Sequence, residues 1–425
     1  MAKSKTRKKK PAIAPVSKTE AIKPFVNRLN ELCDMLGCDV MQHFSTYKEI
    51  LRMARWRFRI GNITDINSEY SNSNYKTKYS KIIKNIAKSP IHKVEGITEY
   101  ISLVDFTYLC ALTNFLERDP NQPEQAQVYL QQLNNRFSPD KLSAYVNQCI
   151  VQASFTKNLP DQSLCAFDAK IISVHQSSSF YIGELLFTMR IIRPQKEHIV
   201  INKQKRLIYQ VFIPCGGKST DLVRSRLKTS ALKPFYKGDK KELLIYIQSH
   251  AIRRFQERTL PIHPIISNYG FNTSLLSIDK PIVKNKKLYL PYHINNVKAG
   301  YFVAEIVDDK VLIKTFIIAS HATAPEGRKF QELTGLHKMD MNYWDITMLN
   351  TFIYNTMTSD NPLYPYFEES GLLPLFQLNE DLSFIDSPSK DVNWQSFSQC
   401  IQKHNRHNTL SNTELESIDF ANALS

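Results

Sequence analysis

Apolar residues recur every three to four positions along much of the first 157 residues, which is the period of an amphipathic helix. The pattern is clear in residues 19–36, 100–119, 120–137 and 138–155. Ser138 directly before Pro139 is a good helix start, because a serine side chain caps free amides and proline suits the first turn. The sequence therefore predicts a helical N-terminal domain over residues 18–157.

The pattern changes after this point. Residues 165–176, 179–194 and 205–215 are rich in Ile, Val, Phe and Tyr with polar interruptions, which is typical of strands. Residues 218–232 return to helical spacing, with Leu222, Leu227 and Leu232 among lysines and arginines. We expect a basic, β-rich region over residues 158–241.

A mixed pattern follows over residues 242–340. A strand is expected at Glu242–Ile247, and Ser249 then has the residue type of an N-cap for a short helix. After a long connection, residues 286–294, 300–309 and 310–320 have the pattern of three strands, with a hairpin turn at Asp308–Lys310. A new helix is expected with Pro325 at its first position.

The C-terminal region, residues 341–425, contains one helical pattern at residues 343–357, and Pro-, Ser- and Asn-rich segments follow it. The expected fold class is therefore α+β. It combines a helical N-terminal domain, a mixed β-rich domain, and a small nuclease-like unit in which a helix precedes an antiparallel sheet. No internal repeat is visible.

Charge is unevenly distributed along the chain, whose formal net charge is +15. Residues 1–17 form a basic arm that we expect to be disordered. Eleven Lys or Arg and two Asp lie between Lys203 and Lys241, whereas ten Asp or Glu and three Lys or Arg follow Thr358. Such a basic segment favours a polyanionic partner, most often nucleic acid, although a merely solvated surface is the alternative.

Several classes of protein fit this sequence poorly. Only 12 glycines occur in 425 residues, which argues against glycine-rich dinucleotide folds. "PCGGKST" at residues 214–220 ends like a phosphate-binding loop, but Phe212 stands where its first glycine is needed. We expect no membrane span, no metal and no cofactor. The seven scattered cysteines are typical of reduced thiols, so we expect a cytoplasmic protein.

The segment "SHAIRRFQERT", residues 249–259, carries the main candidate chemistry. On a helix, His250, Arg254 and Glu257 lie on one face with Arg258 beside them. The helix dipole disfavours imidazolium in the first turn, so His250 can be a neutral base, and the arginines suit phosphate oxygens. The alternative is an ordinary surface helix whose arginines pair with its glutamate.

Residues 310–330 add further candidates. Lys314 is unusual within so apolar a strand, although a lysine at a sheet edge can extend its amine to water. His321 and Thr323 precede an expected helix start, where backbone amides favour anions.

"HAIRRFQER" followed by a β-meander resembles bacterial families with an H-A-x-x-R-x-x-E-R helix before three or four antiparallel strands. Those families look like distant relatives of the barnase/EndoU/colicin/RelE-like ribonucleases, many of which are toxins. The similarity covers residues 242–330. It implies that His250, Arg254, Glu257 and Arg258 line an RNA-facing site. The long connection from Leu260 to Lys284 departs from the shorter members, and several such families have no shown activity.

Two functional hypotheses follow. The first is a metal-independent endoribonuclease, toxin-like or defence-like, in which His250 or Glu257 deprotonates a 2′-hydroxyl and Arg254, Arg258 and Lys314 stabilise the charged phosphorane. The second is a non-catalytic nucleic-acid-binding protein of a phage or mobile element; a purely structural protein is a third reading. RNA is the favoured partner over DNA, and a toxin implies a neutralising protein partner. The candidate nucleic-acid-binding residues are Lys205, Arg206, Lys218, Arg224, Arg226, Lys228, His321 and Thr323.

Overall fold

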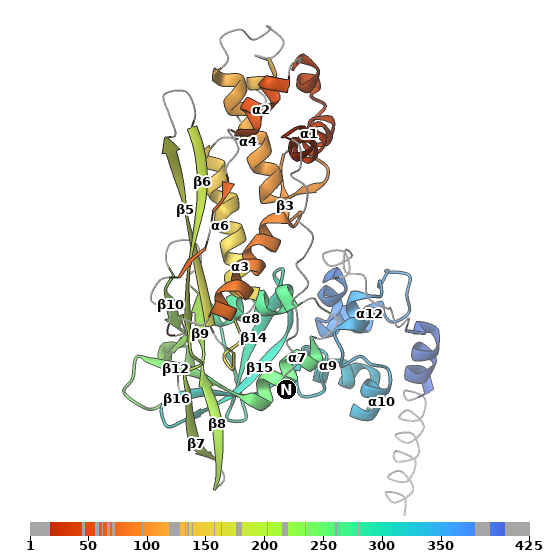
Figure 1. The fold of residues 1–425 in the computed structure, drawn as a ribbon. Coiled ribbons are helices and arrows are strands. Elements are labelled where there is room, and N and C mark those ends of the chain that lie inside the picture. The colour runs from red at the N-terminus through yellow and green to blue at the C-terminus, as the bar shows by residue number, and fades with distance from the viewer. Residues whose placement is uncertain are drawn as a thin grey trace, which may run out of the picture. The chain divides into compact units, whose positions relative to one another are not determined.

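The chain has an α+β fold in a computed structural model (Figure 1). The structure describes residues 18–403, apart from residues 45–46, 56–58, 66–68, 70–72, 119–127, 176–180, 215–219, 379–391 and scattered single or paired positions. The described chain forms two compact units. The helical unit contains residues up to 64, 73–150 and 169–188, and the sheet unit contains residues 65–72, 151–168 and those from 189 onward. The basic arm and Lys218 lie outside the described residues.

The helical unit is built around α4 (Leu103–Arg118). Nearly all sides of this helix carry buried side chains. Leu103, Phe106, Leu109 and Leu112 are fully buried. The helices that contact α4 include α1 (Lys18–Met35), α2 (Tyr47–Arg55) and α3 (Ser73–Lys88). A short helix η1 (Asp39–His43) follows α1, and α6 (Pro139–Thr156) crosses into the sheet unit.

The helical unit also contains strands, which corrects the expectation of a purely helical domain. Short strands β1 (Arg59–Ile60), β2 (Thr64–Asp65), β3 (His92–Lys93) and β4 (Tyr100–Ile101) lie between its helices. The long strands β5 (Leu164–His175) and β6 (Tyr181–Ile192), which agree with the strands predicted at residues 165–176 and 179–194, pair with each other, and β1 pairs with β6 in parallel. The helical periodicity of the segments beside β1, β2, β3 and β4 does not reveal strands that are only two residues long.

An eight-stranded sheet organises the second unit. Its main path has the order β13-β14-β15-β16-β12-β8-β7, and β11 pairs with β12 beside this path. The bounds are β7 (Lys196–Ile201), β8 (Gln204–Gln210), β11 (Arg226–Lys228), β12 (Glu242–Gln248), β13 (Ile282–Lys284), β14 (Lys287–Ile294), β15 (Val297–Val307) and β16 (Lys310–Ile318). The sheet thus joins strands from the expected 158–241 and 242–340 segments. A separate pair is β9 (Phe212–Pro214) with β10 (Leu222–Arg224).

Hairpin turns with positive φ connect the consecutive strands β13 to β16. Asp308 and Asp309 have φ values of 47° and 54°, which fits the hairpin predicted there. All pairings along the main path are antiparallel except β12 with β16, which is parallel. The parallel pair places the carboxyl end of β12 beside the middle of β16, with Ile247 opposite Ile313.

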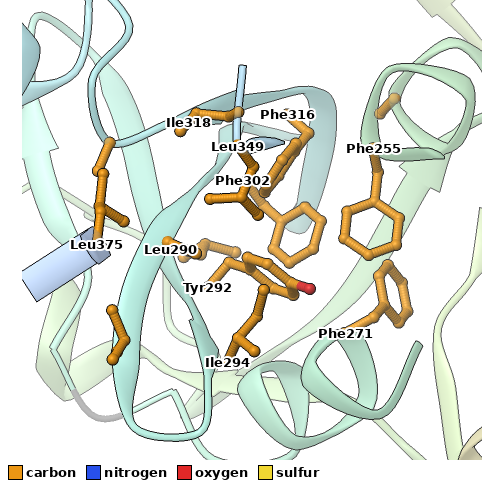
Figure 2. Packing of buried hydrophobic residues seen from close by; sticks show 14 of the residues in the cluster. Phe255, Phe271, Leu290, Tyr292, Ile294, Phe302, Phe316, Ile318, Leu349 and Leu375 are labelled. Atoms are coloured by element: carbon orange, nitrogen blue, oxygen red, sulfur yellow. The ribbon is translucent and has the colours of Figure 1, made fainter. Parts of the chain in front are cut away.

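One face of the sheet holds the main apolar core, which α7 (Ser249–Arg258) and α8 (Pro264–Leu276) cover. Phe255 of α7 points into this core (Figure 2). Its ring centroid lies 5.1 Å from that of Phe316, 5.3 Å from Tyr292 and 5.4 Å from Phe271. Because Ala251, Ile252 and Phe255 are buried, the opposite face of α7 must face outward.

Three expected elements differ from the structure. Residues 218–232 contain β10, β11 and the 3-10 helix η2 (Thr229–Leu232) instead of one helix; β-pairing with β9 and β12 overrides the leucine spacing. The connection from Leu260 to Lys284 contains α8. In the expected helix at 343–357, only α11 (Asn350–Ile353) is a regular helix.

The C-terminal helices pack on the same core as the sheet. They include α9 (Pro325–Thr334), α10 (Lys338–Tyr343), α11, α12 (Tyr364–Ser370) and η3 (Leu373–Phe376). Pro325 begins α9 as predicted. In the described part of the chain, no helix combines the length and the hydropathy that a membrane crossing requires.

Candidate functional site

A pocket of about 550 Å³ opens where β12 passes into α7, and we name it the His250 pocket. Its walls come from three parts of the sheet unit. They are formed by Ile201, Gln204, Arg206, Gln248, His250 and Lys314. None of these residues carries a carboxylate, so the lining offers cations and hydrogen-bond donors to a ligand.

A β-bulge directs Lys314 to this pocket. Val303 of β15 pairs with Thr315, but the next residue, Ala304, pairs with Ile313, so Lys314 is the extra residue. The parallel register ends with Ile247 opposite Ile313, which places Gln248 and Lys314 side by side. Lys314 Nζ donates to Glu305 Oε2 at 2.8 Å. An incoming anion would therefore share this amine with Glu305.

His250 lies in the first turn of α7, although the helix begins one residue earlier than predicted. Gln248 is the N-cap and keeps the extended conformation of β12, and no side chain caps the helix, so Ser249 is not the N-cap. The strand thus continues into the helix without a loop. The positive end of the helix dipole adds to the positive charge of this pocket.

The surroundings of His250 keep its imidazole neutral near pH 7. Desolvation of the ring, followed by the charges of Arg254 and Arg253, lowers its pKa. A guanidinium nitrogen of Arg253 lies 3.1 Å from Nδ1, and a guanidinium can only donate. Nδ1 therefore accepts this bond, and the proton of the neutral ring lies on Nε2. In this state Nε2 is a hydrogen-bond donor rather than a base.

The other predicted catalytic residues do not line the pocket. Arg254 donates to Glu257 at 2.9 Å on the exposed face of α7, and Arg253 lies 3.7 Å from the same carboxylate. Arg258 is half-buried and donates to the carbonyl oxygen of Phe316. Thus His250 and Lys314 come together in the pocket, while Arg254, Glu257 and Arg258 lie along the helix beyond it.

His321 and Thr323 form a local structure after β16. Nδ1 of His321 accepts a hydrogen bond from the backbone amide of Thr323 at 3.2 Å, and its distance to the Thr323 hydroxyl is 2.9 Å. Burial, with the charges of Arg258 and Lys338, lowers the pKa of His321 to about 4. This histidine is therefore neutral at pH 7, and it lies near Arg258 at the far end of α7.

The predicted nucleic-acid-binding residues are spread over β8, β10 and β11. Arg206 lines the His250 pocket, where it donates to Gln204. Lys205 alternates with Arg206 on β8 and therefore points to the other face of the sheet. Arg224, Arg226 and Lys228 are exposed at the side of β12.

Three of the pocket residues, Ile201, Gln204 and Gln248, were not predicted. Glutamine at the end of a strand gives no signal in a sequence, because its contribution depends on which strands become neighbours. Among the described residues, no three His, Cys, Asp or Glu side chains gather as metal ligands would. Comparisons of the chain with known protein families, with curated protein sequences and with solved structures found no match.

Proposed function

We propose that this protein binds nucleic acid, with a backbone phosphate held in the His250 pocket. One observation carries the proposal. Arg206 from β8, Lys314 from the bulge in β16 and His250 from the start of α7 line the same pocket, and no lining residue is acidic. Arginine and lysine are the usual partners of phosphate oxygens, and a helix start adds amide donors.

We propose RNA rather than DNA because residues 242–330 resemble ribonuclease-like families. A neutral His250 supports binding as well, since its Nε2 proton can bond a phosphate oxygen or a 2′-hydroxyl. Protonation of His250 in acid would add a third charge to the pocket. Binding should therefore strengthen as pH falls below 6.5, because the pKa of His250 lies below this ordinary value.

The test is fluorescence anisotropy with a labelled RNA oligomer and a DNA oligomer of the same sequence. We expect the double variant Arg206→Gln, Lys314→Gln to bind RNA roughly tenfold or more weakly, with a shallower salt dependence. Lys329→Gln, which removes an exposed cation of α9, is the control and should change little. A wild-type affinity that does not vary with salt would contradict the proposal.

RNA cleavage is a second candidate function. It is favoured by a neutral His250 lying with Lys314 on one pocket wall. The histidine would take the proton of a 2′-hydroxyl, the 2′-oxygen would bond to phosphorus, and the 5′-oxygen would leave and take a proton from water. His250 must first release the hydrogen bond from Arg253. His250→Ala would abolish cleavage and leave most of the binding, whereas a protein that only binds has no cleavage to lose.

A further inference from the structure

A second pocket lies at the other end of β12. It has a volume of about 440 Å³ and is lined by Lys228, Thr229, Ser230, Lys233, Lys241 and Glu242, and we name it the lysine pocket. Glu242 at the start of β12 lines this pocket, and Gln248 at the end of β12 lines the His250 pocket. Six residue steps separate them, which corresponds to about 20 Å in a strand.

The chemistry of the lysine pocket is that of an anion site. Lys228, Lys233 and Lys241 are all exposed, and no described carboxylate forms an ion pair with them. The acidic member of the lining, Glu242, is already paired with Arg226 at 3.1 Å. The backbone amide and the hydroxyl of Thr229 both donate to the carbonyl oxygen of Lys241 at 2.9 Å. These two bonds hold the segment after β11 against the start of β12.

Between the two pockets, Leu244 and Tyr246 of β12 belong to a small apolar cluster on this face, and cations of the neighbouring strands flank them. Residues 242, 244, 246 and 248 share one face of β12 because side chains alternate along a strand. Arg226 is the register partner of Leu244. Lys310 lies 5.1 Å from the ring centroid of Tyr246, and the charge of Arg224 also acts on that tyrosine.

The acidic residues of this face do not cancel its charge. Glu197 pairs with Lys310 at 2.7 Å, and Glu242 pairs with Arg226. Arg224 remains without an ion pair to a described carboxylate, as do the three lysines of the lysine pocket. Cations therefore flank β12 between the two pockets, with the unpaired ones gathered at its lysine-pocket end.

We infer that a single polynucleotide strand lies along β12, with one phosphate in the His250 pocket and another in the lysine pocket. This inference rests on the proposed function and extends it from one phosphate to a path. About 20 Å accommodates roughly 4 nucleotides, which is within the site sizes of proteins that track a single-strand backbone. Each pocket contains at least two lysine or arginine side chains, and cations flank the strand between the pockets. This arrangement suits regularly spaced phosphates better than an acidic peptide.

The experiment measures affinity for labelled single-stranded RNA of about 2, 4 and 8 nucleotides by anisotropy. The key variant is Lys228→Gln, Lys233→Gln. The matched control is Lys329→Gln, Lys403→Gln, which removes the same charge elsewhere. We expect wild-type affinity to rise steeply beyond about 2 nucleotides, and the key variant to lose most of that rise. Its salt slope should fall by roughly 1, because fewer phosphates are neutralised.

The outcomes separate this inference from the function on which it rests. If Arg206→Gln, Lys314→Gln weakens binding but the key variant matches its control, phosphate binding stands and the path along β12 is wrong. If RNA of every length fails to bind, both are wrong. If polyglutamate of similar charge binds as tightly as RNA and loses affinity in the same variants, the surface serves an acidic protein, which also overturns the inference. Melting temperatures of all variants check that each is folded.

Discussion

His92 in the helical unit and His250 in the sheet unit each have a polar partner at ring nitrogen Nδ1, but their surroundings are opposite. His92 is fully buried; its Nδ1 donates to Gln148 Oε1 at 2.8 Å, and its Nε2 lies 3.4 Å from the Cys149 sulfur. His250 is exposed at a pocket with Arg206 and Lys314. A Cys-His-Gln cluster has the residue types of a nucleophilic site, yet here it is part of a core.

The protonation states explain the difference. Burial raises the pKa of Cys149 to about 12, so its sulfur stays a thiol and donates to Nε2 of His92. The thiolate is the reactive form of cysteine, and the buried Cys149 sulfur is not in that form. The His250 pocket has cations, donors and access together. Residue types alone can suggest a site, but the exposure of the side chains and the charges around them decide whether a ligand can bind there.

The largest expected effect tests whether the His250 pocket depends on the core beneath α7. Phe255→Ala removes the ring that contacts Phe271, Tyr292 and Phe316, and we expect a loss of about 3–5 kcal/mol in the free energy of unfolding. Urea unfolding measures it. Gln256→Ala, at the next and exposed position of α7, should change stability by less than about 0.5 kcal/mol. Equal stability of the two variants would show that α7 does not depend on this packing.

The next effect concerns pH and a third histidine, His321. Its pKa is about 4 in the folded chain and ordinarily 6.5, so between these values the unfolded chain binds more protons. Stability from this group is therefore present above pH 6.5 and is lost as pH falls toward 4, by at most about 3 kcal/mol.

His321→Asn keeps an acceptor for the Thr323 amide but cannot titrate, so it should unfold with a weaker pH dependence than the wild type. Urea midpoints at several pH values between about 4 and 7 provide the measurement. Parallel curves for the two proteins would contradict the assigned burial of His321.

The smallest expected effect compares the two histidines directly. His92→Ala leaves Gln148 and Cys149 without their buried partner, and we expect a loss of about 2 kcal/mol in stability with unchanged RNA affinity. His250→Ala should do the reverse, with stability within about 0.5 kcal/mol of wild type and a modest loss of RNA affinity, because Arg206 and Lys314 remain in the pocket. Urea unfolding and anisotropy on both variants test this crossed pattern. A loss of RNA affinity in His92→Ala at temperatures where it is folded would break the comparison.

The sequence by itself determined the local elements whose pattern agrees with their packing. Short apolar runs predicted β12, β14, β15 and β16, paired aspartates predicted the turn at Asp308, and Pro325 predicted the start of α9. Helical spacing also placed His250, Arg254 and Glu257 on one face of α7, opposite the buried Ala251, Ile252 and Phe255. These features depend on neighbours within a few residues, which a sequence displays directly.

Only the tertiary structure decided which of the candidate residues meet. The parallel pairing of β12 with β16 and the bulge at Lys314 bring that lysine to His250, and the pairing of β8 with β12 adds Arg206. Strand order and register arise from contacts between segments that are far apart in the chain. The same long-range pairing turned the expected helix at residues 218–232 into β10 and β11, because hydrogen bonds to β9 and β12 outweigh a local leucine spacing.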